Sequence, residues 1–388
     1  MNLDKKMIKN NIPRIRFNSF KAFWAEKRIA DIVKISAGGD VDKERLKESG
    51  KYPVIANALT NKGIVGFYDD YKVKAPAVTV TGRGDVGYAV ARHKNFTPVV
   101  RLLTLQSENI DVDYLENQIN SMRILNESTG VPQLTAPQLG NYKVYHPEIE
   151  EQSAIGSLFR MIDDLLASYK DNLANYQSLK ATMLSKMFPK AGQTVPEIRL
   201  DGFEGEWKKL KLRDVVHTNP KSELPENFKY IDLESVVGTR IEKIREESKE
   251  SAPSRAQRLA KKGDVFYQTV RPYQKNNYLF KLDEIDYVFS TGYAQLRPIY
   301  KSCDSDFLLI LLQNNRFLNK VLDRCTGTSY PAINVNDLIE ILIAIPSYEE
   351  QQVIGAYFSN LDNLINSYQE KLSQLETLKK KLLQDMFI

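Results

Sequence analysis

Two loops of this chain carry side chains able to read the edges of nucleic-acid bases. The first is glycine-rich, runs from Thr79 to Tyr88 and is followed by Arg92 to Asn95; the second runs from Tyr267 to Asn277. Arginine, lysine, asparagine and glutamine can hydrogen-bond to guanine and adenine, and the basic side chains also hold phosphates. Ordinary polar turns are the alternative interpretation. From the chemistry of the side chains and their placement in loops, we expect the following residues to contact DNA, of which the last two lie beyond the two loops: Arg83, Tyr88, Arg92, His93, Lys94, Arg271, Tyr273, Lys275, Asn276, Arg324 and Tyr330.

Other patterns could suggest cofactor binding or catalysis. Gly82 to Gly87 matches the glycine fingerprint of dinucleotide-binding proteins, but no helical period follows it before Pro98, so the strand-glycine-helix context is missing. Asp232 with Glu247 and Lys249 resembles the spacing in some metal-dependent nucleases, a match that arises easily in a charged chain. The three histidines do not have metal-ligand spacing. We expect no catalytic, cofactor-binding or metal-binding residue in the chain.

The elements that must position the two loops are repeated along the chain. Residues 147–188 return as residues 346–387 with no insertion or deletion, including a Glu-Glu-Gln stretch at the start and Met-Phe at the end. The openings of the two halves also match, since Arg16 and Trp24 correspond to Arg199 and Trp207. Between these landmarks the halves have diverged strongly. The order is therefore variable block, helix, variable block, helix.

Both repeated segments have the apolar spacing of a coiled coil. Apolar or aromatic residues step alternately by four and three, which is a period of 3.5 residues. We expect two helices of about 33 residues, roughly 50 Å long, that pair antiparallel. Two unrelated amphipathic helices, each packed on its own domain, are the alternative. The predicted helix-pairing residues are Ile155, Phe159, Ile162, Leu166, Tyr169 and Leu173 in the first helix and Ile354, Phe358, Leu361, Ile365, Tyr368 and Leu372 in the second.

The repeat predicts four segments and a mixed fold. They are a first block (1–145), a first helix with its linker (146–194), a second block (195–345) and a second helix (346–388). Each block is large enough for its own core. The fold class is α/β (α+β): two similar globular domains separated by a helix pair, with a pseudo-twofold internal repeat. We expect strands at Tyr52–Ala56, Ala77–Thr81, Val99–Leu105, Tyr230–Leu233, Asp264–Tyr267 and Ala294–Pro298.

The charge of the chain is unevenly distributed. The net charge is +5, and the excess lies in the first block, where 22 Lys and Arg face 15 Asp and Glu. This balance favours a polyanionic partner, although it could also serve solubility alone. The two cysteines suit a reducing compartment. The charged stretch Met1–Asn11 lacks the apolar core of a signal peptide and no apolar run could span a bilayer, so we expect a cytoplasmic protein.

In this arrangement the chain resembles the specificity subunit of type I restriction-modification systems over essentially its whole length. The tandem helices with their Glu-Glu-Gln starts and the opening around Trp207 carry the resemblance. So do the stretches Ser290–Pro298, Gly130–Leu134 and Tyr330–Ile333. Each is modest alone, but their order and duplication are specific.

The resemblance implies two target recognition domains, each reading one half of a split, asymmetric DNA sequence, with the helices setting the unread spacer. It also implies assembly with two adenine methyltransferase subunits, which use S-adenosylmethionine, and with restriction (translocase) subunits, which use ATP and Mg²⁺. The chain itself is then non-catalytic and directs where its partners act on double-stranded DNA.

Two other classes of protein would make different predictions for this chain. A DNA methyltransferase with its own recognition domain needs an Asn-Pro-Pro-Tyr-like tetrapeptide, and the nearest stretch, Asn219–Ser222, lacks the aromatic residue that would stack on a flipped adenine. A coiled-coil interaction scaffold without DNA sequence specificity is the second hypothesis for this chain. It predicts no salt-sensitive binding to DNA.

Overall fold

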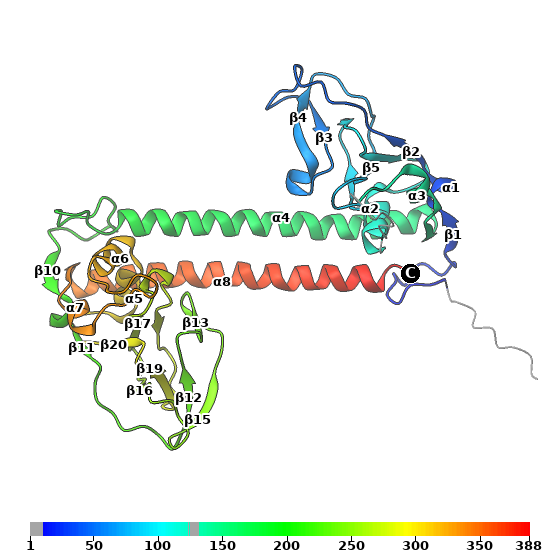
Figure 1. Ribbon diagram of the computed structural model, residues 1–388. Coiled ribbons are helices and arrows are strands. Elements are labelled where there is room, and N and C mark those ends of the chain that lie inside the picture. Colours follow the sequence, from blue (N-terminus) through cyan, green and yellow to red (C-terminus); the bar gives the residue numbers. More distant parts are fainter. Residues whose placement is uncertain (1–10, 123, 125–131) are drawn as a thin grey trace, which may run out of the picture. The chain divides into compact units, whose positions relative to one another are not determined.

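The chain folds into two compact units. The computed structural model describes residues 11–122, 124 and 132–388. Unit 1 comprises residues 1–171 and 370–388, and unit 2 comprises residues 172–369. Each unit contains one predicted block and parts of both long helices (Figure 1). The four predicted segment boundaries stay a prediction, since this division cuts through both helices. Residues 1–10 of the charged N-terminus, and Gly130 and Val131, lie outside the described residues.

Unit 1 contains two small sheets. The main sheet is antiparallel, with strand order β2–β8–β5–β6. In the second sheet, ordered β4–β3–β7, β3 pairs antiparallel with β4 and parallel with β7. β5 is buried at every position, as expected for an interior strand rich in valine and threonine. The bounds are β2 Lys34–Ala37, β3 Tyr52–Ile55, β4 Ile64–Tyr68, β5 Ala77–Val80, β6 Ala89–Arg92, β7 Thr97–Pro98 and β8 Leu103–Gln106.

Unit 2 repeats this plan. Its main sheet has the order β11–β20–β17–β18, again antiparallel throughout. Its second sheet has the order β15–β12–β19–β16, and β12 pairs antiparallel with β15 and parallel with β19. The bounds are β11 Val216–Thr218, β12 Asn227–Ile231, β15 Arg245–Ser248, β16 Ala256–Leu259, β17 Val265–Gln268, β18 Tyr278–Leu279, β19 Tyr287–Ser290 and β20 Tyr293–Pro298. β5 therefore corresponds to β17, and β3 to β12, although their sequences have diverged.

Short helices and a two-stranded ribbon complete each unit. In unit 1 the ribbon pairs β1 with β9, and in unit 2 it pairs β10 with β21. Unit 2 also has the hairpin β13–β14. The bounds are β1 Ala25–Arg28, α1 Ile29–Ile32, η1 Thr60–Gly63, α2 Val112–Ser121, α3 Ala136–Asn141, β9 Lys143–His146, β10 Lys208–Lys211, η2 Leu212–Asp214, β13 Val236–Val237, β14 Arg240–Ile241, η3 Pro272–Gln274, α5 Ser305–Gln313, α6 Asn315–Leu322, α7 Val335–Ile339 and β21 Leu342–Ile345. The mixed fold class predicted from the sequence is confirmed.

Most predicted strands occur where expected, with ends shifted by a few residues. The prediction of one strand over Val99–Leu105 is wrong in its first part. Arg101 has a φ of +68°, a left-handed conformation that interrupts extended backbone, so β8 begins at Leu103.

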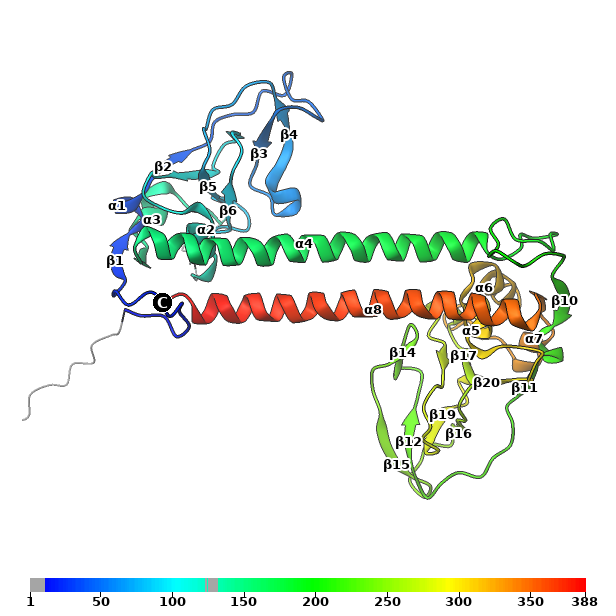
Figure 2. The same cartoon turned by 180° about the vertical axis from the view of Figure 1, so that it is seen from behind.

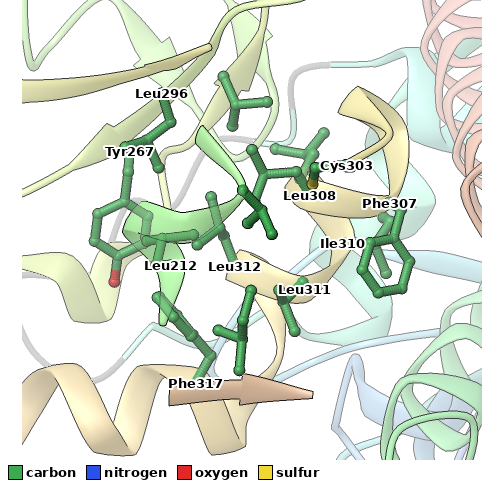
Figure 3. Close-up of a cluster of buried hydrophobic side chains, with 14 of the residues drawn as sticks. Leu212, Tyr267, Leu296, Cys303, Phe307, Leu308, Ile310, Leu311, Leu312 and Phe317 are labelled. Carbon is green, nitrogen blue, oxygen red and sulfur yellow. The ribbon is translucent and has the colours of Figure 1, made fainter. Parts of the chain in front are cut away.

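The largest core of unit 2 lies where α5 covers the main sheet. Leu308 and Leu312 of α5 gather with Leu212, Tyr267 and Leu296, all buried (Figure 3). Asp304 starts α5 because its carboxylate accepts a hydrogen bond from the Phe307 amide at 3.0 Å. In both views α5 and α6 lie beside the beginning of α8 (Figure 1, Figure 2).

The two long helices, α4 (Ile149–Lys186) and α8 (Tyr348–Asp385), each contain 38 residues. Each is roughly 57 Å long, a little longer than predicted, since the first turn already begins in the Glu-Glu-Gln stretch. In both helices two glutamates lie in the first turn, where carboxylates interact favourably with the helix dipole. The predicted helix-pairing residues are buried, apart from Tyr169, Leu173 and Tyr368, which are half-buried.

The helices pair antiparallel in each unit. In unit 1, Lys379 Nζ lies 2.5 Å from Asp163 Oδ1, and Lys170 pairs with Glu376 at 3.2 Å. In unit 2, Lys180 forms an ion pair with Asp362, and the rings of Tyr176 and Tyr368 lie 5.5 Å apart. As the residue numbers rise along α4, the numbers of the contacting residues in α8 fall, so the two helices run antiparallel. Asp163 and Lys180 are the repeat counterparts of Asp362 and Lys379, so the two ion pairs are copies of one contact.

Candidate nucleic-acid interface

The residues repeated between the halves attach each block to a long helix. Arg16 donates to the two carboxylate oxygens of Glu151 at 2.6 and 2.7 Å, and the Trp24 indole donates to the same group at 3.2 Å. In unit 2, Arg199 donates to Glu350 at 2.8 and 2.7 Å. Both glutamate side chains are 2% exposed. The hydrogen bond that Arg16 donates to Glu151 is the main reason that the pKa of Arg16 is raised. These repeated residues connect the start of each block to the first turn of a long helix.

The next residues of each helix position the helix of the block. In unit 1, Gln152 accepts from the amide of Asp111, the residue that caps α2. A Cβ on Gly156 would lie 2.3 Å from Asp111 Oδ1, so α2 can approach α4 only because glycine stands there. Gln351 and Gly355 contact the start of α5 in the same way. The blocks are therefore attached to the two helices by a repeated set of contacts.

In unit 1 three diverged segments meet at the carboxyl end of β5. We call residues 57–63, 82–88 and 99–101 loop cluster 1. Asn57 holds the segments together, because its Oδ1 accepts from the Gly82 amide at 2.8 Å and its Nδ2 donates to Val100 O at 3.0 Å. Gly82 is required for close approach, since a Cβ there would lie 2.2 Å from Arg101 O. Arg83 is exposed and forms an isolated bridge with Gln133.

The glycines of this loop close a hairpin. The loop connects β5 to β6, so a strand follows it and the dinucleotide-binding interpretation is excluded. Gly84 and Gly87 have φ of +77° and +87°, a conformation that favours glycine. Tyr88 is 41% exposed at the end of the loop. Partial burial raises the pKa of its hydroxyl, with smaller contributions from neighbouring carboxylates.

The predicted residues after β6 have different surroundings. Arg92 is partly buried and donates to Thr79 Oγ1 at 2.9 Å and to Lys62 O at 2.8 Å. Burial lowers the pKa of its guanidinium to about 10. His93 Nε2 lies 2.9 Å from Asp113 Oδ1. Arg92 therefore braces loop cluster 1 from within, and the exposed Lys94 is the better placed of these residues to contact a ligand.

In unit 2 residues 268–277, which lie after β17 as residues 82–88 lie after β5, meet residues 326–332, and we call these two segments loop cluster 2. The Arg271 amide donates to Pro331 O at 2.7 Å, and the Ile333 amide donates to Thr269 O at 3.0 Å. The same contact occurs in unit 1, where the Leu134 amide donates to Gly82 O at 2.9 Å. Thr269 is thus the counterpart of Gly82 in the two main sheets.

Loop cluster 2 exposes Tyr273 and Tyr330 and places the half-buried Arg271 beside Tyr330. The Arg271 guanidinium carbon lies 4.4 Å from the centroid of the Tyr330 ring. Tyr330 is 63% exposed and Tyr273 is 50% exposed. Aromatic rings and a guanidinium at a surface can stack on bases or hydrogen-bond to their edges.

The other predicted residues of unit 2 have partners within the protein. The Lys275 ammonium donates to Gln313 O at 2.8 Å and to the Asn315 side chain, and burial followed by the charge of Lys180 lowers its pKa. Asn276 Oδ1 accepts from the Gly238 amide at 2.9 Å, and Arg324 donates to Lys320 O at 2.7 Å. The sequence indicates the chemistry of a side chain but not whether its donors are already occupied. Whether any predicted residue contacts DNA stays a prediction.

Sequence reasoning missed Asn57, Lys62 and Arg101 in loop cluster 1. Lys62 and Arg101 are basic residues with positive φ, and Asn57 connects the segments that hold them. A strained non-glycine backbone is enriched at functional sites, but it cannot be read from one sequence. In the sequence, Asn61 and Lys62 indicate only an ordinary turn.

The residues considered for catalysis or metal binding lie in ordinary surroundings. No group of three His, Cys, Asp or Glu residues within them could hold a metal ion. Asp232, from the nuclease-like pattern, contacts Ser235 and Arg245, and Lys249 pairs with Glu226 at 3.8 Å. In the part of the chain that the structure covers, no helix combines the length and apolarity needed to cross a membrane. Both cysteines are free thiols, Cys303 buried and Cys325 half-buried.

Known proteins share both the sequence pattern and the fold. Residues 22–175 and 204–377 match the family described as "Type I restriction modification DNA specificity domain". The MjaVIII specificity subunit of a type I restriction enzyme from Methanocaldococcus jannaschii is 23% identical, with 93% of this chain and 91% of the relative covered. A putative type I specificity subunit from Mycoplasma genitalium is 22% identical over 96% and 97% of the two chains.

A solved structure agrees with the observed fold. The crystal structure of a type I restriction-modification system S subunit from M. genitalium has a TM-score of 0.68 and 17% identity, and covers 97% of this chain and 99% of that one. The two family matches coincide with the two topologically equivalent blocks and most of their helices, and they do not favour a scaffold without DNA specificity. The chain therefore belongs to the type I restriction modification DNA specificity domain family, contains two copies of that domain and has a role in DNA sequence recognition.

Proposed function

We propose that this chain is the specificity subunit of a type I restriction-modification complex and that each unit reads one half of a split, asymmetric sequence in double-stranded DNA. The observation that carries the proposal is the same strand order occurring twice in one chain, with a diverged loop cluster at the corresponding place in each copy. Two copies with different loops read two different half-sites, which makes the target asymmetric.

The helices set the unread spacer in this proposal. α4 and α8 are single uninterrupted helices that pair within each unit, which supports the proposal that they act as a stiff spacer. Two readers that are joined in this way bind in fixed register, and the second contact forms as an intramolecular event. Binding should then depend steeply on salt, because several phosphates are neutralised together.

The chemistry belongs to partner subunits. We assign adenine methylation to two methyltransferase subunits that use S-adenosylmethionine, and cleavage to translocating restriction subunits that use ATP and Mg²⁺. Specificity subunits of this kind select the site and carry no catalytic group. The two free thiols and the chemistry of a DNA-modifying complex support a cytoplasmic location.

Coexpression of the chain with its methyltransferase subunit tests the proposal. Methylated adenines are mapped across the host genome by single-molecule sequencing, with and without the chain. The expected result is a two-part motif with a constant gap that disappears when the chain is omitted. Methylation that does not change on omission would contradict the proposal and would favour a scaffold.

A further inference from the structure

We propose that Arg271 reads a guanine in the half-site bound by unit 2 and that Tyr330 holds the guanidinium in its reading position. This assignment rests on the function proposed above. It concerns one side chain, one base pair and one half-site, so it can fail while the wider function stands.

The Arg271 guanidinium lies over an aromatic ring and makes no hydrogen bond with the residues that the structure describes. Its carbon lies 4.4 Å from the Tyr330 ring centroid, and no described residue supplies an acceptor or a carboxylate partner to its N–H groups. A contact with an aromatic face restricts a guanidinium and leaves the donors at its edge available. A planar pair of donors matches the O6 and N7 acceptors of guanine in the major groove.

The backbone under Arg271 is held in a demanding conformation. Its φ of +53° lies in the left-handed region, where the corresponding residue of unit 1 is Gly84 with a φ of +77°. Such a conformation costs about 1–3 kcal/mol for a residue other than glycine and persists when the surroundings enforce it. Unit 2 thus holds an arginine in a backbone conformation that unit 1 gives to a glycine.

A buried glutamine enforces this conformation. Gln268 is 1% exposed, and its Nε2 donates to Val270 O at 2.7 Å and to Gln274 Oε1 at 2.8 Å, on either side of Arg271. The backbone N–H of Gln268 donates to Asn277 Oδ1 at 2.9 Å, and this hydrogen bond connects the two ends of the loop. Gln268 is therefore a positioning residue. The guanidinium is preorganised, and a preorganised donor loses less conformational entropy on binding.

Neighbouring basic side chains are less available than Arg271. The donors of Lys275 and Arg324 are directed to carbonyl groups of α5 and α6. A phosphate and a guanine edge can each accept two hydrogen bonds from a free guanidinium, and replacing the base pairs one at a time distinguishes the two contacts. Among the predicted basic residues of unit 2, Arg271 has the geometry of a base reader.

The test uses the complex of the full chain with its methyltransferase subunit and DNA duplexes that contain the mapped motif. Each base pair of the motif is replaced in turn, and methylation rates are measured for the wild type, Arg271→Gln and Tyr330→Ala. Lys262→Gln is the matched control: it removes one exposed charge before β17 begins, at the end opposite to Gln268. Arg83→Gln changes the equivalent loop of unit 1.

For the wild type, replacing one guanine should lower the rate roughly 10- to 100-fold. In Arg271→Gln this penalty should disappear or change to a preference for adenine, with the other half-site unaffected. Tyr330→Ala should reduce the discrimination at the same base pair, but less strongly than Arg271→Gln. This second variant keeps the test valid if Arg271→Gln folds poorly. Lys262→Gln should retain the wild-type base preferences, and Arg83→Gln should affect only the other half-site.

If Arg271→Gln lowered the methylation rate equally for every duplex, and if the slope of log DNA affinity against log salt concentration became smaller by about one, Arg271 would contact a phosphate. That result would overturn the assignment. Unchanged discrimination in Arg271→Gln and Tyr330→Ala would overturn it too. In both cases a wild-type complex that still methylates a two-part motif leaves the wider function intact. A wild-type complex whose methylation does not depend on this chain would instead contradict the wider function.

Discussion

Replacing Glu151 with alanine removes the acceptor of three hydrogen bonds, two from Arg16 and one from Trp24. Breaking a buried ion pair leaves an uncompensated charge and costs about 3 kcal/mol. We expect unit 1 to lose stability by this amount in urea unfolding. The exposed neighbour Glu150→Ala should cost less than about 1 kcal/mol, because it loses only a favourable helix-dipole interaction. Equal effects of the two substitutions would contradict the structural role of Glu151.

Glu116 makes the stability of unit 1 depend on pH. Burial is the main cause that raises the pKa of its carboxyl above the ordinary value of 4.5; Asp163 and Asp113 also raise it, whereas Lys379 and a hydrogen bond from the Ala91 amide lower it. Because the pKa of Glu116 is higher in the folded state than in the unfolded state, its carboxyl group favours folding when the pH is below the unfolded-state pKa. That contribution is lost as pH rises through the folded-state pKa.

Glu116→Gln should therefore be more stable than the wild type at pH 7 and nearly equal to it at pH 4, because the amide carries no charge. Free energies of unfolding measured between pH 4 and pH 8 check this expectation. Glu108→Gln, an exposed change in the same block, is the control and should alter stability little at either pH. A variant less stable than the wild type at pH 7 would contradict the prediction.

Single residues were the least predictable part of the molecule. Arg92 and Lys275 have the side-chain types that read DNA, yet both donate to carbonyl groups of their own unit. These partners come from residues 30 and 38 positions away in the sequence. Side-chain chemistry is local, whereas occupation of a donor depends on long-range folding, so the sequence could not separate Arg271 from Lys275.

At the scale of elements, the two long helices followed most directly from the sequence. Their apolar spacing depends on residues three and four apart, and such local patterns survive divergence. The ion pairs Asp163–Lys379 and Lys180–Asp362 reuse residues that match between the repeats. That repeated acid and base were a signal for antiparallel pairing in a defined register.

Lengthening both helices should change the spacer and leave both half-sites unchanged. One heptad of seven residues is inserted after Tyr176 in α4 and after Ser367 in α8, so that the facing pair Tyr176 and Tyr368 keeps its register. The added length is roughly 10 Å, or about three base pairs. Mapping of methylated adenines should show the same two half-sites with a gap longer by about that number. A changed half-site would contradict the division of labour between helices and blocks.

At the scale of the whole molecule, the repeat predicted two similar domains, but the sequence did not show the strand order that they share. Their strands are short and were predicted separately, but strand order depends on pairs such as β3 with β7, which are joined in parallel across a long connection. The sequences of these strands need only be apolar and β-branched, so divergence removed their similarity without changing their order. The repeat that remained visible consists of residues with specific partners, such as Glu151 and Glu350.

The account rests on two readers that act independently. The most direct measurement exchanges residues 1–145 for the corresponding block of a relative with a different mapped target, followed by mapping of methylated adenines in a host that contains the methyltransferase subunit. One half-site should change to that of the relative, while the other half-site and the gap stay the same. A change in both half-sites, or in neither, would contradict the account.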